Sequence, residues 1–237
     1  MRGSALVIAE LYPDLLGTYG DGGNVRVLQR RLEWRGIAVE VATVNGADCV
    51  PEQADLYVLG GGEDLAQLHA LALLRGSALA AAVDHGRPVF AVCAGLQLLG
   101  RTLSVGLQET TGLGLVDAES YRLAHRAVGE VLCRAHDPEL GLVNGFVNHG
   151  SGTRLGPAAR PFATAVHGPA NEGDDLGPEG LVQGSVVGTY LHGPVLARNP
   201  LLADWLLTRA VGSPLAPLPP GAGEALAAAR TASFNRR

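Results

Sequence analysis

Pro88-Val89-Phe90-Ala91-Val92-Cys93-Ala94-Gly95-Leu96-Gln97-Leu98-Leu99 is the stretch of sequence that decides the fold. An apolar run ends in a cysteine, two small residues follow, and a leucine-rich segment begins. We interpret Pro88–Val92 as a buried strand that leads directly into a helix. A nucleophile at such a turn is lifted clear of the sheet, and Ala94-Gly95 leaves room for a sharp bend of the backbone. The N-terminus of a helix also favours the thiolate of Cys93 over the thiol.

The segments before this stretch alternate between short apolar runs and amphipathic ones. We predict strands at Ala5–Ala9, Ile37–Val44 and Leu56–Leu59. Between them we predict a helix capped by Asn24 and one long helix over about Asp64–Val83. Strands and helices that alternate at this spacing are typical of a parallel sheet with helices on both faces.

After about residue 103 the pattern changes to short apolar runs separated by turn residues, and Asn199-Pro200 predicts the start of a helix. The expected fold is therefore α/β, with a mostly parallel central sheet, helices on both faces and an antiparallel extension in the second half. One domain, residues 1–211, is followed by a Pro/Gly/Ala-rich tail over 212–237 with a short helix near Glu224–Arg230. The strands predicted in the second half are Gly114–Val116, Ala127–Leu132, Gly145–Asn148, Ala163–Val166, Gly180–Gln183 and Val186–Tyr190.

The composition excludes several classes of function. Apolar residues make up 47% and charged residues 17% of the 237, which is typical of a globular chain with a substantial core. All 18 basic residues are arginine, so neither a Schiff-base lysine nor a P-loop lysine is present. The net charge of −5 argues against non-specific binding of nucleic acid.

The three cysteines form neither a disulfide framework nor a C-x-x-C pair. Cys49 and Cys133 fit the pattern of buried core residues. Cys133 and His136 have the only spacing that resembles a metal site, and no second pair of ligands lies nearby, so we expect no metal. The apolar run Ala5–Ala9 is too short for a signal peptide, and no later segment approaches a membrane span. We therefore expect a cytoplasmic protein.

A thiolate nucleophile needs a proton carrier for its leaving group, and histidine serves best at neutral pH. Seven histidines compete for this role. His149 in Gly145–Gly150 and His192 in Gly188–Pro194 both follow a β-rich run and face a glycine turn. Spacing alone leaves these two histidines open.

Three motifs, in this order, resemble class I glutamine amidotransferases of the branch with cobyric acid synthase-like glutaminase domains. The match runs from about residue 5 to 208. The resemblance implies Cys93 as nucleophile and His192 as base. It also implies an oxyanion hole built from backbone N–H groups near Gly61 and after Cys93, at Ala94. The motifs are Gly60-Gly61-Gly62-Glu63-Asp64, Cys93-Ala94-Gly95-Leu96-Gln97 and Gly188-Thr189-Tyr190-Leu191-His192-Gly193-Pro194.

Within this branch the chain is most similar to the small glutaminase subunits of lipid II isoglutaminyl synthases. The resemblance implies that L-glutamine is hydrolysed to glutamate and ammonia through a Cys–His thioester mechanism. The ammonia would pass to an ATP-dependent, Mur-ligase-like synthase subunit in a heterodimer, which amidates the D-glutamate of lipid II for peptidoglycan synthesis. No cofactor is expected on this chain, and ATP and Mg²⁺ are expected on the partner. The further stretches that carry this match are Leu11–Asp21, Asn148-His149-Gly150, and Gly193-Pro194 with Asn199-Pro200.

The same family of subunits uses an arginine to recognise the α-carboxylate of glutamine, and Arg126 is the best match here. A planar guanidinium suits bidentate recognition of a carboxylate. The alternative is a solvated arginine at the start of a strand. Gln97, one turn into the helix after Cys93, either lines the substrate pocket or is an ordinary polar residue of that turn.

Many class I amidotransferases carry a glutamate two residues after the catalytic histidine, and this glutamate orients the imidazole. Here that position is Pro194, and the next carboxylate along the chain is that of Asp204. The sequence therefore predicts a Cys–His dyad, an acid from a distant part of the chain, or an acid supplied by the partner. Our hypothesis is that the partner supplies it in trans, and the dyad remains the main alternative.

Three other functions remain open on the sequence. A glutaminase of a cobyrinate-type or other amide-forming system would share every site residue. A non-catalytic regulatory module on the same fold would not need Cys93 and His192. A peptidase with a similar nucleophile turn is disfavoured because Ala94-Gly95 follows the nucleophile, in place of the Gly-x-Ser-x-Gly pattern.

Overall fold

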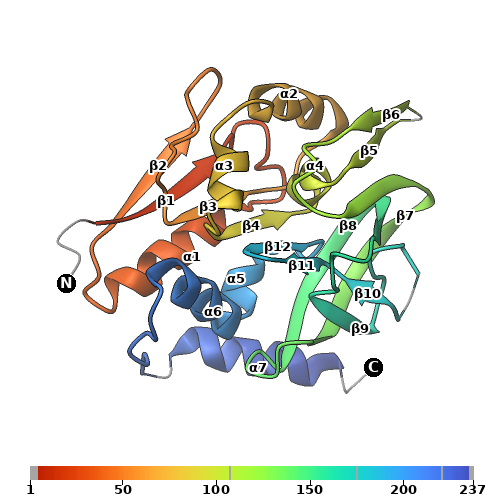
Figure 1. Ribbon diagram of the computed structural model, residues 1–237. Helices are drawn as coiled ribbons and strands as arrows, with labels where there is room; N and C mark the ends of the chain where they lie inside the picture. The colour runs from red at the N-terminus through yellow and green to blue at the C-terminus, as the bar shows by residue number, and fades with distance from the viewer. Residues whose placement is uncertain (1–4, 107, 175, 220, 235–237) are drawn as a thin grey trace.

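The centre of the molecule is a six-stranded sheet, seen edge-on across the middle of Figure 1. The computed structural model describes residues 5–106, 108–174, 176–219 and 221–234. The strand order is β11-β12-β4-β3-β1-β2. The strands from β12 to β2 are parallel to one another, and β11 pairs antiparallel with β12 at one edge. The strands are β1 (Leu6–Leu11), β2 (Val39–Val44), β3 (Leu56–Leu59), β4 (Val89–Val92), β11 (Leu181–Gln183) and β12 (Val186–Thr189).

The parallel strands are apolar because helices cover both faces of the sheet. Every residue of β3, β4 and β12 is buried. Figure 1 shows α2 and α4 on one side of this sheet and α1, α5 and α6 on the other. No helix among the described residues is long and apolar enough to cross a membrane. The helices are α1 (Gly22–Glu33), α2 (Asp64–Leu74), α3 (Leu79–Asp84), α4 (Ala94–Leu99), α5 (Val195–Arg198), α6 (Pro200–Val211) and α7 (Ala222–Phe234).

A second, mostly antiparallel sheet stands beside the first one, in the order β10-β9-β7-β5-β6 with β8 paired to β7. Its main feature is the long hairpin of β7 and β8, and its one parallel pair is β5 with β7. The predicted α/β fold with an antiparallel extension is confirmed. The strands are β5 (Thr102–Val105), β6 (Gln108–Thr111), β7 (Ala118–Ala135), β8 (Leu142–Leu155), β9 (Ala163–His167) and β10 (Pro178–Glu179).

The structure corrects three predicted elements. The long helix predicted over Asp64–Val83 is two helices, because the chain leaves the helical region after α2 and Gly76 adopts a φ of +72°. Asn24 does not cap α1 but lies inside it, where its side-chain oxygen accepts a hydrogen bond from the Leu196 N–H at 3.0 Å. The strand predicted at Gly114–Val116 is instead a loop, whose backbone N–H groups donate to the carbonyls of Leu99 at the end of α4 and of Gly100.

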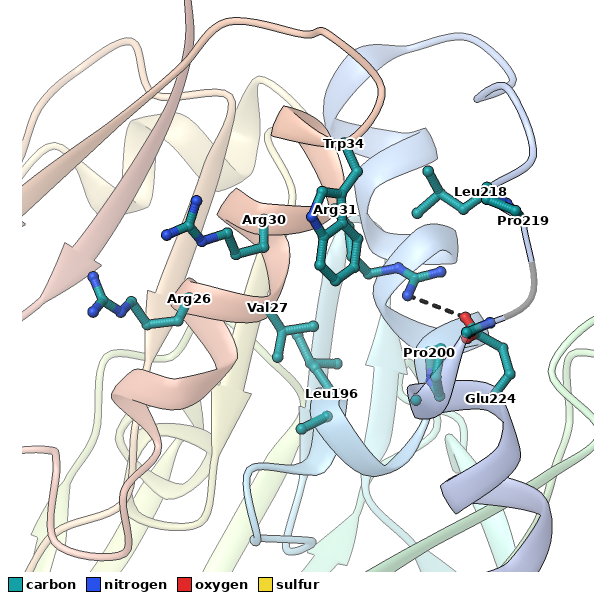
Figure 2. A pocket seen from close by; sticks show the side chains of 13 residues that line it. Arg26, Val27, Arg30, Arg31, Trp34, Leu196, Pro200, Leu218, Pro219 and Glu224 are labelled. Atoms are coloured by element: carbon teal, nitrogen blue, oxygen red, sulfur yellow. Dashed lines mark hydrogen bonds and ion pairs between the residues drawn. The ribbon is translucent and has the colours of Figure 1, made fainter.

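The C-terminal tail packs on the body of the molecule. It leaves α6 at Gly212, whose φ of +74° ends the helix, and returns as α7 along α5, α6 and β8. A pocket of about 830 Å³ remains between α1 and this tail. Figure 2 shows the side chains that line it. Trp34 and Leu218 line it, and the ion pair of Arg31 with Glu224 closes one edge at 3.3 Å. This pocket is therefore a product of how the tail folds back, and its lining does not include Cys93.

A cluster of charges joins α1 to α6 beside this pocket. Asp204 accepts hydrogen bonds from Arg31 at 2.7 and 2.8 Å and from Arg35 at 2.8 Å. Burial by itself raises the pKa of Asp204, but the hydrogen bonds and charges of the two arginines outweigh burial and bring this pKa below its usual value. Asp204, the first carboxylate after His192 in the sequence, therefore stabilises the packing of α1 on α6 and does not orient the imidazole.

We expect Asp204→Asn to lower the free energy of unfolding by about 2 kcal/mol at pH 7, since Arg35 loses its carboxylate and Arg31 keeps only the longer contact with Glu224. The folded-state pKa of Asp204 is depressed, so its stabilisation is present above the unfolded value of about 3.9 and is lost as pH falls through the folded pKa. The difference from wild type should therefore shrink below about pH 4. Urea unfolding at several pH values measures it.

Glu33→Gln is the matched control. Glu33 pairs with Arg30 across one turn of α1, and that arginine side chain is 67% exposed. An exposed pair of this kind contributes little, so we expect a change below about 0.5 kcal/mol. Equal losses for the two variants would contradict the structural role given to Asp204.

Candidate active site

Cys93 lies on a strained turn between β4 and α4. Its φ of +52° and ψ of −107° are rare for a residue with a side chain. Two contacts hold the turn: the Cys93 N–H donates to the Thr189 carbonyl at 2.8 Å, and the Gly95 N–H donates to the Gly60 carbonyl at 3.1 Å. A Cβ at Gly95 would lie 2.7 Å from the Leu59 Cβ, so only glycine allows this approach. The predicted strand-to-helix turn is confirmed, and it presents the thiol at the edge of the sheet.

His192 follows β12 and is fixed between the two sheets. Its backbone N–H donates to the Phe146 carbonyl at 2.7 Å, and the Phe146 N–H donates to the His192 carbonyl at 3.2 Å. The imidazole is 1% exposed. Its Nε2 is buried and has no ordinary hydrogen-bond partner among the described residues. That nitrogen is therefore available to the thiol and to a leaving group.

Asp21 occupies the orienting position beside His192. Both of its carboxylate oxygens lie 3.1 Å from His192 Nδ1, and Oδ2 also accepts the Gly61 N–H at 2.8 Å. Both side chains are 1% exposed. The third member is thus an acid from a distant part of the same chain. The hypothesis of an acid supplied in trans is wrong, and so is the alternative of a dyad.

The electrostatics of this group favour an imidazolium. Burial by itself lowers the pKa of His192, but interactions with Asp21 and with Cys93 outweigh it and raise the pKa to about 9. At neutral pH, His192 therefore carries a proton on each ring nitrogen, one shared with Asp21 and one on Nε2.

Asp21 reaches this place because of where its loop begins. The loop leaves the carboxyl end of β1, next to the ends of β3 and β4, and loops at this edge of a parallel sheet meet at one site. It then packs directly on the Gly60-Gly61-Gly62 turn: a Cβ at Gly60 would lie 1.9 Å from the Leu16 carbonyl oxygen. The position of Asp21 in the loop after the first strand was the signal that the sequence analysis missed.

Gly61 has a steric role that the resemblance did not imply. A Cβ there would lie 2.8 Å from His192 Cε1 and 3.3 Å from Cys93 Cβ, so glycine is required where the imidazole and the thiol approach each other. Its N–H donates to Asp21. Gly62, the next residue, and Ala94, the residue after Cys93, both line the pocket. Their backbone N–H groups are therefore the candidates for an oxyanion hole.

His149, the rival histidine, lines the same pocket but is held neutral. Burial lowers the pKa of His149 to about 4, and the charges of His192 and Arg126 act in the same direction. Its Nδ1 lies 2.7 Å from the Ser151 carbonyl oxygen, which fixes the proton on Nδ1, and its ring stacks on Tyr190 at 3.9 Å. With a pKa of about 4, His149 holds no second proton at neutral pH and so cannot protonate a leaving ammonia as His192 can.

Arg126 lies on β7 at an irregularity in its pairing with β8, and it lines the pocket beside Cys93. Its Nε donates to the Asn148 side-chain oxygen, and its Nη2 donates to the Tyr19 hydroxyl at 3.0 Å. The structure adds a second arginine that the sequence analysis did not single out. Arg122 lines the same pocket and is paired with Asp64 at 3.7 Å.

Gln97 lines the pocket and is also part of the core. Its Oε1 accepts from Gln67 at 2.9 Å, and its Nε2 donates to the Tyr190 hydroxyl at 3.1 Å. Tyr190 is in turn within 2.6 Å of the Thr153 hydroxyl. Gln97 thus lines the pocket, as one of its two interpretations expected. Because it is buried and bonded to Gln67 and Tyr190, it is not an ordinary polar residue of the first helical turn.

The other cysteines lie outside the site. Cys133 is buried as expected, and burial first, then the charge of Glu179, raises the pKa of its thiol. The prediction that Cys49 is buried is wrong, because it is exposed on the loop after β2. His136, the other half of the weak metal spacing, binds the Thr164 hydroxyl at 2.8 Å. Among the described residues, no group of three or more ligands could hold a metal ion.

Comparison with known proteins now gives the family. Residues 7–200 match the CobB/CobQ-like glutamine amidotransferase domain. The chain belongs to this family. The strained turn at Cys93, the buried His192 and the Asp21 carboxylate thus belong to a glutamine-dependent enzyme. The resemblance stated from the motifs is confirmed.

Two relatives of this amidotransferase match along most of their length. Both are subunits GatD of glutamine-hydrolysing lipid II isoglutaminyl synthases. The one from Staphylococcus aureus (strain N315) is 32% identical and covers 86% of this chain and 84% of its own length. The one from Streptococcus pneumoniae (strain ATCC BAA-255 / R6) is 32% identical and covers 87% of this chain and 80% of its own length. A cobyric acid synthase from Nocardia farcinica is 38% identical over 65% of this chain but only 31% of that protein.

Solved structures agree on the fold of the amidotransferase. A glutamine amidotransferase from Thermotoga maritima superposes with a TM-score of 0.53 at 16% identity, covering 88% of this chain and 82% of the other. PurLQS from the same organism gives a TM-score of 0.56 at 15% identity, covering 88% and 98%. At these identities the likeness concerns the arrangement of strands and helices only.

We expect Asp21→Asn to lower kcat for glutamine hydrolysis by about 100-fold or more, since the amide cannot stabilise the imidazolium. The pKa of His192 should fall below 9 at the same time, which an NMR titration of the imidazole measures. Asp14→Asn changes an exposed carboxylate of the same loop and should leave both values unchanged. Wild-type kcat for Asp21→Asn would show that another acid orients His192.

Proposed function

We propose that this chain is the glutaminase subunit of a lipid II isoglutaminyl synthase, which hydrolyses L-glutamine to glutamate and ammonia. The observation that carries the proposal is the group of Cys93 on its strained turn, His192 as imidazolium and Asp21 behind it. This group has the parts of a thiol-based acyl transfer: nucleophile, proton carrier and orienting acid.

The chemistry follows from the positions of the protons. The Cys93 thiolate attacks the carboxamide carbon of glutamine, and the carbonyl electrons move to its oxygen. His192 gives its Nε2 proton to the amide nitrogen, which leaves as ammonia while the C=O bond re-forms in a γ-glutamyl thioester. Neutral His192 then takes a proton from water, whose oxygen attacks the thioester. Glutamate leaves, and the Cys93 thiolate and the His192 imidazolium are restored.

We place the oxyanion between the backbone N–H groups of Gly62 and Ala94. Both residues line the pocket, and Ala94 is the first residue of α4, where a helix leaves its N–H groups free of intrahelical partners. One such donor accounts for about 3 kcal/mol of transition-state stabilisation in comparable sites. Asp21 takes the Gly61 N–H and so fixes the turn that presents Gly62.

The two charged ends of glutamine match the rim of the pocket. Arg126 is the proposed partner of the α-carboxylate, because its guanidinium stands at the pocket edge and suits a bidentate contact. Glu63 lines the same pocket and supplies negative charge for the α-ammonium group. Gln97 lies at the floor, near the carboxamide.

We further propose that ammonia passes to a Mur-ligase-like partner in a heterodimer, in the cytoplasm. On this proposal the partner holds ATP and Mg²⁺ and activates the D-glutamate carboxyl of lipid II, while this chain holds no cofactor. Leu65 is 81% exposed and Val128 is 55% exposed, and each is close in sequence to a residue that lines the pocket. Exposed apolar side chains of this size are suited to contact with a partner.

The main alternative is a glutaminase of a cobyrinate-type system, and coverage disfavours it. The two isoglutaminyl synthase subunits align over 84% and 80% of their own length, whereas the cobyric acid synthase aligns over 31%. A non-catalytic module is disfavoured by the intact Cys93, His192 and Asp21. A regulatory role does not require a buried ion pair beside a strained thiol.

The test of this function is amidation of lipid II by this chain together with the synthase subunit. Cys93→Ser should abolish amidation with L-glutamine and leave amidation with ammonium chloride at the wild-type rate, because only ammonia release needs the thiol. Cys49→Ser is the matched control and should keep both activities. Amidation of a corrinoid but not of lipid II would overturn the assignment of the acceptor.

We expect Arg126→Lys to raise KM for glutamine by about 10-fold or more, with a smaller change in kcat, since an ammonium cannot make the bidentate contact. Arg134→Lys changes an exposed arginine on the same strand and should leave KM unchanged. Steady-state glutaminase kinetics measure both. An unchanged KM for Arg126→Lys would remove Arg126 from the substrate site.

A further inference from the structure

Arg126, proposed to hold the α-carboxylate of glutamine, already donates a hydrogen bond to a side chain of the protein itself, that of Tyr19. Arg126 Nη2 donates to the Tyr19 hydroxyl at 3.0 Å, and the Asn148 side-chain N–H donates to the same oxygen at 3.2 Å. The hydroxyl proton points to Glu63 at 3.5 Å. Tyr19 thus presents to Arg126 an oxygen that accepts two hydrogen bonds, as a carboxylate oxygen would.

The ring of Tyr19 also covers the catalytic histidine. Its centroid lies 4.6 Å from that of His192, with the ring planes tilted by 55°. Tyr19 lines the pocket beside Cys93, and the centre of a water-sized sphere can move through only about 30 Å³ of it. The pocket is therefore narrow where Tyr19 lies. Cys93 is accordingly only 6% exposed.

We infer that Tyr19 is the gate of the glutamine site. Its hydroxyl takes the place of the substrate α-carboxylate on Arg126, and its side chain must swing out before glutamine can reach Cys93. The inference rests on the proposed function, since it assumes that glutamine is the molecule admitted. It goes beyond that function by naming the group that controls admission.

The moving part is the side chain and not the loop. The Thr18 N–H donates to the Gly61 carbonyl at 3.2 Å, and two residues after Tyr19 the Asp21 carboxylate holds His192 and the Gly61 N–H. A displaced loop would take the orienting acid away from the histidine. Rotation of Tyr19 about its own side-chain bonds opens the pocket and leaves Asp21 in place.

The gate also selects for amino acids. A carboxylate makes a charge-assisted, bidentate contact with a guanidinium, which is stronger than the contact of a neutral hydroxyl. Glutamine can therefore displace Tyr19 from Arg126. A simple amide without an α-carboxylate cannot displace Tyr19 from Arg126, so the pocket stays closed to it.

Tyr19→Phe tests the hydroxyl while it keeps the ring. In the full chain carrying Cys93→Ser, which binds glutamine without turnover, the Kd for L-glutamine should fall about two- to tenfold, the effect of one competing neutral hydrogen bond. Tyr121→Phe removes a hydroxyl that donates to Glu172, and since neither of these residues lines the pocket, Kd should stay unchanged. A raised Kd for Tyr19→Phe would make Tyr19 a substrate contact, and an unchanged Kd would also overturn the gate.

A second measurement tests the ring without any glutamine. Iodoacetamide is a small amide without an α-carboxylate, and mass spectrometry follows its reaction with Cys93 in a Cys49→Ser background. Tyr19→Ala should raise this rate severalfold over the unaltered tyrosine, and Tyr121→Ala should not. Equal rates would overturn the gate.

The glutamine-binding and iodoacetamide experiments distinguish failure of the gate from failure of the proposed glutaminase function. If neither form of the Cys93→Ser chain binds glutamine, the proposed function fails, and the iodoacetamide rates still decide whether Tyr19 covers the thiol. If glutamine binds but Tyr19 variants change neither Kd nor the alkylation rate, only the gate is lost.

Discussion

The site depends on one carboxylate that serves two neighbours. Asp21 holds the Nδ1 proton of His192 with both oxygens and at the same time accepts the Gly61 N–H. The first contact sets the charge and orientation of the base. The second fixes the glycine turn against which the base and the thiol approach each other. Since all three groups are buried, neither contact can be exchanged for water without a large cost in solvation.

Around this carboxylate the chain is packed through glycines. Gly60, Gly61 and Gly95 each stand where a Cβ would meet backbone or a catalytic side chain at 3 Å or less. The loop after β1, the turn after β3 and the turn at Cys93 can approach only because these residues lack side chains. A second sheet then supplies Phe146, which pairs with the backbone of His192, and Arg126, which closes the rim.

The sequence predicted the fold and part of the site for physical reasons that can be named. Leu56–Leu59 was predicted with its correct bounds because a short apolar run between turn residues is typical of a buried parallel strand. Cys93 was found because its position between strand and helix is a local feature. Asp21 and Tyr19 could not be assigned in the same way, because their roles depend on strand order, which brings the loop after β1 beside β3 and β4. Gly76 shows the reverse failure, since one residue with a positive φ divided a helix whose composition looked continuous.

The separation of Cys93 and Arg126 between two sheets has a consequence for what the enzyme accepts. The thiol belongs to the central parallel sheet and the arginine to the long β7–β8 hairpin, and the backbone pairing of Phe146 with His192 joins the two sheets beside the site. In the proposed mode one end of the substrate is anchored on each. The separation of the two sheets would then select substrates by length. Asparagine is one methylene shorter than glutamine, so its amide would not reach the thiol when its carboxylate is bound to Arg126. Discrimination by length would need no side chain of its own.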